Sequence, residues 1–300
     1  MQTTALTTLS ADVASIAAQA SQSTVALAHR GRWFSGFHWR TDVIATAAEL
    51  VRAKPGETIT VLTASRETVE GTLIGQDPST DLALIRVQST AHPVSTPSSA
   101  GPSLGEIVVV AGRSPHGPTC AIGFVGLAGG AWQSMKGGDI SARVWLNVRM
   151  MPHAEGSAVL DAQGSFIGMA VYGPRRRALL IPTETIERAA HELLAHGRIR
   201  RGYLGVAVQP VAVQPASEGA GRANKTGLMI VSLDAAGPAV QAGLRQGDIV
   251  LALDGKVLES GRSLARMLRR AEPGTTAELA ISRSGQEIAV SVVLGERPTT

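Results

Sequence analysis

Side chains with intrinsic reactivity are scarce in this sequence. It holds one cysteine, Cys120, at the start of the apolar run Cys120–Val125. A thiolate is a nucleophile and a metal ligand, but a thiol in apolar surroundings stays protonated and inert. We therefore predict a buried structural thiol rather than a nucleophile. With a single cysteine no internal disulfide can form, which permits a reducing compartment without proving one.

Arginines gather in three short runs, at 175–177, 198–201 and 269–270, and the net charge is +4. Basic patches bind nucleic acid by neutralising phosphates, and aromatic side chains between them stack on bases. No such aromatic interleaving is present around these arginines. We predict solvated surface charge and no nucleic-acid partner, and we rank nucleic-acid binding last among the functions considered.

The first residues bear on the compartment. Residues 1–28 lack a basic start followed by a continuous apolar stretch, so they do not resemble a secretory signal. No apolar run reaches the length of about 18 residues that a membrane helix needs. As written, the chain is predicted to be cytoplasmic and to have no membrane span. A longer true N-terminus would make it periplasmic.

The first part of the chain reads as short, regularly spaced strands, and these would hold the residues of any site located there. Apolar runs alternate there with turns rich in Gly, Pro, Asp and Ser. This spacing is typical of a barrel or sandwich, and the lack of long intervening helices argues against a parallel α/β sheet. We predict two six-stranded barrels, with strands at 24–27, 43–46, 58–62, 82–87, 107–110, 121–125, 144–148 and 166–171.

Two helices flank these strands. Residues 9–20 place apolar side chains at helical spacing, which predicts a short amphipathic helix that packs on the first domain or, alternatively, binds a partner. Residues 183–196 form the second helix, with Thr183 as the N-cap and Gly197 as the stop. The domains are therefore predicted at 1–22 (helical segment), 23–197 and 202–296.

Residues 202–296 form a smaller α+β unit. Strands are predicted at 227–232 and 247–253, helices at 237–244 and 262–270, and two further strands close the unit. The segment 209–226 is rich in Gly, Ala and Pro and is predicted to be a mobile loop.

The second unit resembles a PDZ domain along its whole length. The resemblance rests on the combination of GYLGV (202–206), GPAVQAGLRQGDIVLALDGK (237–256) and SLARMLRR (263–270). It implies β-augmentation, in which an extended C-terminal peptide adds as a strand beside a helix while loop N–H groups receive its carboxylate. By resemblance the peptide-binding residues are Tyr203, Leu204, Gly205, Val206, Arg201, Leu264, Met267 and Leu268. The alternative, most evenly balanced for Leu268, is that these side chains only pack the core.

The first unit resembles the HtrA/Deg serine proteases, which are trypsin-like enzymes of the chymotrypsin fold, from about residue 23 to 202. The matching stretches are IGQDPSTDLALIRV (74–87), AVLDAQGSFIGMAVYG (158–173) and the helix that follows. The resemblance places the family's catalytic aspartate at Asp81. It places Glu49 where the family has histidine and Glu155 where it has the nucleophilic serine.

These replacements predict a loss of catalysis. A serine hydroxyl needs an adjacent base such as imidazole, and Glu155 offers no hydroxyl. The oxyanion hole is also in doubt, because His153 and Ser157 stand where the family has glycines. A shifted alignment would make Ser157 an alternative nucleophile, with His153 or His116 as its base.

Three carboxylates, Glu49, Asp81 and Glu155, would meet in one cleft, where they cannot all ionise cheaply. The favoured outcome is that their side chains swing into solvent. One could instead hold a proton or pair with His153 or Arg149, or the three could bind a cation. No metal-loop spacing is present, so we predict no metal and no cofactor.

The leading hypothesis is a non-catalytic HtrA-like protein, an adaptor or chaperone that binds C-terminal tails or unfolded segments of proteins. The alternative is a serine endopeptidase that uses the shifted nucleophile. The resemblance also implies a homo-trimer or a hetero-oligomer with active paralogues. No aromatic residue precedes Trp33, which puts the aromatic contacts of that trimer interface in question.

Overall fold

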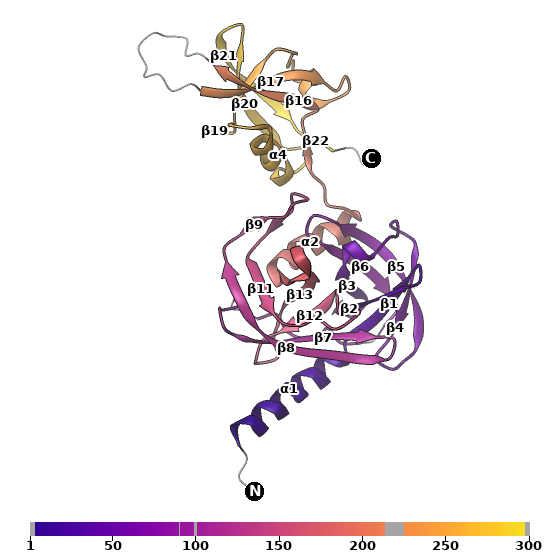
Figure 1. The fold of residues 1–300 in the computed structure, drawn as a ribbon. Coiled ribbons are helices and arrows are strands. Elements are labelled where there is room, and N and C mark those ends of the chain that lie inside the picture. Colours follow the sequence, from indigo (N-terminus) through magenta and orange to yellow (C-terminus); the bar gives the residue numbers. More distant parts are fainter. Residues whose placement is uncertain (1–3, 90, 99–100, 214–224, 298–300) are drawn as a thin grey trace. The chain divides into compact units, whose positions relative to one another are not determined.

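The computed structural model describes residues 4–89, 91–98, 101–213 and 225–297. The chain divides into two compact units, Met1–Ile199 and Arg200–Thr300. The ribbon in Figure 1 shows mostly strands in both units, with few helices. The predicted mainly β architecture, two six-stranded barrels followed by a smaller unit of strands and short helices, is confirmed.

The first barrel is a closed antiparallel sheet in the order β1-β2-β3-β6-β5-β4. Closure leaves no free edge and puts alternate side chains into one apolar interior. A short 3-10 helix, η1 (Ala48–Leu50), follows the third strand. The strands are β1 (Thr24–His29), β2 (Arg32–Arg40), β3 (Val43–Ala47), β4 (Thr58–Leu62), β5 (Thr68–Asp77) and β6 (Leu82–Val87).

The second barrel closes in the order β11-β14-β13-β12-β7-β8, again with antiparallel neighbours. A small hairpin of β9 (Trp132–Gln133) and β10 (Asp139–Ile140) and a 3-10 turn, η2 (Pro174–Arg176), extend from it. The strands are β7 (Ile107–Ser114), β8 (Gly117–Gly129), β11 (Arg143–Asn147), β12 (Ser157–Leu160), β13 (Phe166–Tyr172) and β14 (Ala178–Pro182).

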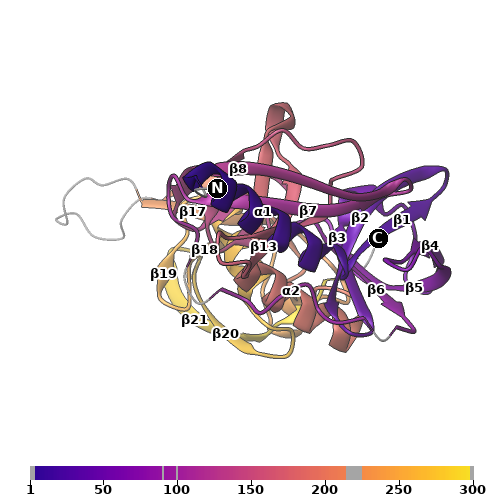
Figure 2. The ribbon, with the colours of Figure 1, turned by 90° about the horizontal axis from the view of Figure 1, so that it is seen from below.

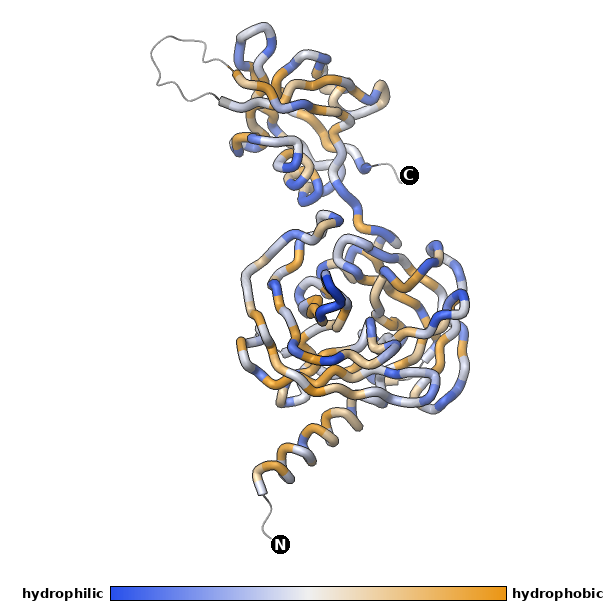
Figure 3. Tube along the Cα trace, in the orientation of Figure 1, coloured by the Kyte–Doolittle hydropathy of each residue, from blue (hydrophilic) through white to orange (hydrophobic). Residues whose placement is uncertain are grey.

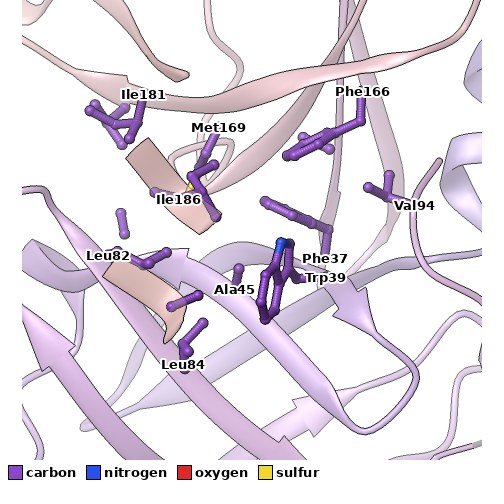
Figure 4. Close-up of a cluster of buried hydrophobic side chains, with 14 of the residues drawn as sticks. Phe37, Trp39, Ala45, Leu82, Leu84, Val94, Phe166, Met169, Ile181 and Ile186 are labelled. Carbon is purple, nitrogen blue, oxygen red and sulfur yellow. The ribbon is translucent and has the colours of Figure 1, made fainter. Parts of the chain in front are cut away.

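An apolar layer joins the two barrels. Phe37 of β2 and Phe166 of β13 have ring centroids 5.1 Å apart, and Met169 and Ile186 pack with them (Figure 4). Ile186 belongs to α2 (Thr183–His196), which ends at Gly197 in the left-handed conformation, as predicted. Thr183, predicted as the N-cap, is instead the first helical residue, because Pro182 occupies the cap position without a side-chain bond.

The N-terminal helix is longer and more exposed than predicted. It spans α1 (Ala5–Ser21), and only Ala20 is buried. Figure 1 shows the N-terminal part of α1 pointing away from the barrels, and in the view of Figure 2 the helix lies across β7 and β8, which it contacts. Hydrophobic residues recur along it (Figure 3), yet Leu6 is 77% exposed. Packing on the first domain is therefore limited to the last turns, around Ile16 and Ala20.

The second unit builds one sheet in the order β16-β17-β18-β20-β21, with β19 on β18, and a separate β15–β22 pair. The predicted loop 209–226 is wrong at both ends, because strand pairing extends to Val213 and resumes at Lys225. Its middle, 214–224, lies outside the described residues. The elements are β15 (Gly202–Tyr203), β16 (Val206–Val213), β17 (Lys225–Leu233), α3 (Pro238–Gln241), β18 (Ile249–Leu253), β19 (Lys256–Val257), α4 (Gly261–Arg270), β20 (Thr276–Arg283), β21 (Gln286–Val293) and β22 (Gly295–Glu296).

A buried ion pair fastens this unit. Asp248, directly before β18, accepts from Arg283 Nη2 at 2.7 Å and from Nε at 2.8 Å, and it also receives the Arg245 N–H. The hydrogen bond from Arg283 is the main reason that the pKa of Asp248 lies below its usual value. A carboxyl with a lowered pKa in the folded state stabilises the fold above its unfolded pKa and loses that effect as the pH falls.

We expect Asp248→Asn to lower the melting temperature of the protein by several degrees at pH 7. The gap between wild type and variant closes as the pH falls below about 4, because the wild-type carboxyl then becomes protonated too. Thermal unfolding from pH 3 to pH 8 measures this. A gap that does not change with pH would contradict the assignment.

Candidate functional site

Asp81 is held rigidly at the start of β6. It lies in a turn shaped by the Asp77 carboxylate, which accepts from the N–H and hydroxyl groups of Ser79 and Thr80. Asp81 has a left-handed backbone, with φ of 58°. Its Oδ1 accepts the backbone N–H of Glu49 at 2.8 Å, and its carbonyl accepts the N–H of Ala48 at 3.2 Å. The aspartate is thus tied to the end of β3.

Glu49 stands on η1, immediately after β3, and its side chain is exposed. The pairing of β3 with β6 brings Ala47 opposite Leu82, so the residues that follow β3 and precede β6 come together. This register explains why Glu49 and Asp81, which are 32 positions apart, form a backbone-to-carboxylate hydrogen bond.

Glu155 comes from the other barrel, in the turn before β12. Its carbonyl accepts the N–H of Ser35 at 3.1 Å, and its Oε1 accepts the N–H of Tyr172 at 3.2 Å. The side chain is half-buried. We expected the carboxylate side chains to point into solvent. Glu49 does so, whereas the Glu155 side chain binds the backbone at the end of β13.

The three carboxylates influence one another electrostatically. Burial, opposed by the hydrogen bond from Glu49 and reinforced by the charges of Glu155 and Glu49, raises the pKa of Asp81 to about 7. Burial also raises the pKa of Glu155, and the charge of Glu49 adds to that rise. Near neutral pH the Asp81 carboxyl is therefore only partly ionised. Over the described residues, no group of three or more His, Cys, Asp or Glu side chains is arranged to hold a metal ion.

Ser157 does not lie in this cleft. It is completely buried, and its Oγ has no hydrogen-bond partner among the described residues. It packs against Gly112, where an added Cβ would lie 2.1 Å from that Oγ. The two imidazoles considered as its base are elsewhere: His153 Nδ1 contacts the Trp33 carbonyl, and His116 is exposed in the β7–β8 turn.

The turn around Glu155 is tight although His153 and Ser157 replace two of the family's glycines and only Gly156 remains. His153 adopts the left-handed backbone with φ of 64°, and Gly156 has φ of 85° with Ser35 O only 2.4 Å from the position of an added Cβ. In the described part of the chain, the N–H groups of His153 and Glu155 find no acceptor. His153 thus adopts the backbone that its side chain was expected to disfavour.

A cavity of about 300 Å³ is lined by two of the three carboxylates, Glu49 and Asp81, and not by Glu155. Its walls include Trp132, Trp145, Tyr172 and Leu179, with Lys136 among the polar residues. Arg143 lies 4.8 Å from the centre of the Trp132 ring, and Arg176 lies 4.6 Å from that of Tyr172. The cleft therefore offers an apolar, aromatic surface beside its acids, and it has the apolar lining expected of a binding pocket.

A second cavity, of about 230 Å³, lies in the PDZ unit between α4 and β16. It gathers seven of the eight predicted peptide-binding residues, and β16 pairs on one side only, with β17, so its other edge is open. Gly205 has φ of 78° at the mouth of the loop. Met267 does not line the cavity and packs against the core. Sequence reasoning missed Val208, Gly261, Ala265, Arg269 and Arg297, of which Val208 follows Val206 at strand spacing and Ala265 precedes Leu268 at helical spacing.

Cys120 is exposed, which overturns the predicted buried thiol. It lies on β8 opposite Ala111, and alternate residues of that strand, Ile122 and Phe124, are also exposed. The apolar run is therefore a barrel strand with one apolar face turned outward.

Comparison with known proteins places both units in described families. A trypsin-like peptidase domain matches residues 34–169 and a PDZ domain matches residues 202–294. A probable periplasmic serine endoprotease DegP-like of Rhizobium meliloti (strain 1021) is 28% identical over 253 residues, or 81% of this chain and 49% of its own length. The counterpart of Halomonas elongata is 29% identical over 272 residues, or 88% and 56%. The chain thus spans about half the length of the curated relatives it matches.

Solved structures share the fold. A serine endoprotease from Yersinia pestis superposes with a TM-score of 0.73 at 23% identity, covering 95% of this chain and 98% of the other. The HtrA-type protease AlgW with a decapeptide superposes with a TM-score of 0.74 at 22% identity, covering 96% and 99%. Over the described residues, no helix has the length and apolarity to cross a membrane.

We expect Asp81→Asn to stabilise the protein at pH 8 by roughly 1–3 kcal/mol relative to wild type. A carboxyl whose pKa is raised on folding stabilises the fold while protonated, and this is lost as the pH rises from about 4 through about 7. Asparagine keeps an oxygen for the Glu49 N–H. Urea unfolding at pH 5 and pH 8 measures the difference in unfolding free energy between variant and wild type, which we expect to become small as the pH falls toward about 4. An equal effect at both pH values would disprove the raised pKa.

Proposed function

Because the chain combines a trypsin-like peptidase domain with a PDZ domain and is homologous to DegP-like serine endoproteases, we propose that it is a non-catalytic member of this group. In this proposal it binds C-terminal tails or unfolded segments of proteins and works as an adaptor or chaperone. The observation that carries it is the cleft itself, in which Glu49 and Glu155 flank Asp81 where a base and a nucleophile are needed.

The chemistry of the cleft supports the absence of proteolysis. A carboxylate at 155 has no hydroxyl to attack a peptide carbonyl, and a carboxylate at 49 cannot pass a proton to a leaving amine as imidazole does. The Glu155 carboxylate also accepts the Tyr172 N–H at the end of β13. That donor is then occupied and cannot bind the backbone of an incoming peptide.

The serine endopeptidase alternative depends on Ser157. Its burial behind Gly112, away from both candidate imidazoles, counts against it, since a base must come within about 3 Å of the hydroxyl.

Peptide binding is supported by the groove of the second unit. Backbone groups along the free edge of β16 can pair with an added strand, and Leu264, Leu268 and Val208 supply apolar lining. Arg201 and Arg297 line the end of the groove near Gly205 and bring positive charge to the place where a terminal carboxylate is expected. A tail ending in an apolar residue fits this surface best.

The similarity to DegP-like proteins also suggests an oligomeric state and a cellular compartment. We propose that the protein forms a homo-trimer or a hetero-oligomer with active paralogues, and that the exposed apolar residues of α1 contribute to the contact. The relatives' description as periplasmic supports the periplasm over the cytoplasm.

We expect wild-type protein to leave unfolded casein intact, and Ser157→Ala to behave identically. The double variant Glu49→His/Glu155→Ser restores base and nucleophile beside Asp81 and is expected to gain slow cleavage that an inhibitor of serine proteases abolishes. Either single variant stays inactive, because triad members act as a unit. Casein cleavage by wild type that disappears in Ser157→Ala would overturn the proposal.

For the groove, we expect a peptide with an apolar C-terminal residue to bind with micromolar affinity and to lose at least about tenfold when its C-terminus is amidated. Leu268→Ala weakens binding by a similar factor. Met267→Ala, its neighbour outside the groove, is the matched control and keeps wild-type affinity. Fluorescence anisotropy measures all of these. Equal losses in both variants would show that α4 only packs the core.

A further inference from the structure

Arg113 is a buried cation without a counter-ion. It lies near the end of β7 and is 5% exposed. Its Nε donates to the Thr24 carbonyl at 2.8 Å and its Nη2 to the Ser21 carbonyl at 2.7 Å. No carboxylate among the described residues pairs with it, and burial together with the charge of Arg66 lowers its pKa. Two neutral carbonyls do not compensate a buried positive charge.

Hydrogen bonds hold both the backbone and the side chain of Arg113 in place. Its N–H donates to Ser35 Oγ at 2.8 Å, and that hydroxyl donates to the Arg113 carbonyl at 3.0 Å. The guanidinium is held by the two carbonyls on either side of the junction between α1 and β1. Its Nη1 makes no hydrogen bond with the described residues, so two N–H donors remain free at a defined place.

His38 supplies a buried polar atom without a partner. It belongs to β2 and is 2% exposed, and its Nδ1 has no hydrogen-bond partner among the described residues. Burial lowers the pKa of this imidazole, opposed by backbone interactions with Thr41 and Arg40. A buried polar atom without a partner costs free energy, so a native structure that keeps one calls for an explanation such as a ligand.

Both side chains line one cavity of about 730 Å³ in the first unit. The end of α1, the β4–β5 turn and the segment after β6 complete its wall. Thr63 and Gln88 add hydroxyl and amide groups, and Glu67 is the one carboxylate that lines it in the described chain. None of its lining residues lines the carboxylate cleft or the PDZ groove, so this is a separate site.

We propose that this cavity binds a small organic anion whose phosphate or carboxylate group pairs with Arg113 and His38. The free Nη1 edge donates to one oxygen, and the His38 imidazole bonds a second. Arg66, in the β4–β5 turn between the lining residues Ser65 and Glu67, interacts electrostatically with Arg113 and adds positive charge near the cavity, whereas Glu67 opposes it. The volume exceeds that of the anionic group alone and suits a metabolite-sized ligand, whose remaining polar groups would meet Thr63 and Gln88.

The experiment uses the full chain with inorganic phosphate and acetate as probes, each against chloride at equal ionic strength. We expect saturable stabilisation in thermal unfolding and a matching calorimetric titration. Stronger binding of phosphate than of acetate would assign a phosphate group, and the reverse a carboxylate. The His38 imidazole resonance is expected to shift with the same midpoint, which locates the anion at this cavity.

Variants at the rim keep the fold intact because both side chains are exposed. We expect Arg66→Ala to weaken the affinity for the better probe about two- to fivefold and Glu67→Gln to strengthen it by a similar factor. Arg52→Ala, an equal loss of charge on the same barrel outside the cavity, is the matched control and leaves the affinity unchanged. Arg113→Lys abolishes saturable binding in a variant that remains folded.

The proposal is overturned by chloride that stabilises as well as either probe. It is equally overturned by a His38 resonance that does not respond at saturation, or by a folded Arg113→Lys variant that binds like wild type. If Arg52→Ala loses as much affinity relative to wild type as Arg66→Ala does, the titration reports only the net charge of the protein, and this too overturns the proposal.

Discussion

The apolar layer between the two barrels determines the geometry of everything around the cleft. Glu49 and Asp81 come from the first barrel and Glu155 from the second, so their separation depends on how Phe37, Phe166 and their neighbours pack. Dense packing of this kind does not deform gradually, because each side chain fills a shaped space. The carboxylates are therefore kept close in a partly buried setting. Burial first, and the neighbouring carboxylate charges second, raise the pKa values of Asp81 and Glu155.

The same packing explains the shape of the turn around position 155. Gly156 leaves no room for a Cβ beside Ser35 O and Thr46 Oγ1, both on the first barrel. The preceding His153 adopts a left-handed backbone, which costs a non-glycine residue about 1 kcal/mol. The contacts between barrels thus constrain the turn whatever side chain stands at position 155.

Much of this was accessible from the sequence, and the exceptions have physical causes. Asp81 was predicted from the resemblance of residues 74–87 to the HtrA/Deg segment, and the PDZ groove from the resemblance of residues 202–270 to a PDZ domain. The strands Arg32–Arg40 and Thr68–Asp77 were missed, since glycine and charged residues interrupt their apolar pattern. The short apolar strands Ser157–Leu160 and Ala178–Pro182 were also missing from the predicted set. Cys120 was misplaced because an apolar run does not reveal which face of a strand is covered. The direction of Ser157 and the bond from Tyr172 to Glu155 depend on the second barrel's closure, which no local pattern encodes.

The exposed part of α1 has a consequence for how the molecule comes apart. Residues from Ala5 to about Asp12 are all exposed, so this stretch is held chiefly by its own backbone hydrogen bonds and its Thr4 cap. An isolated helix of such length is only marginally stable in water. Its amides will therefore exchange with solvent through local opening at almost no free-energy cost, while those of the barrel strands wait for global unfolding. A proteinase added to the native protein will find its first cleavage sites in this stretch, and the barrels will survive the loss.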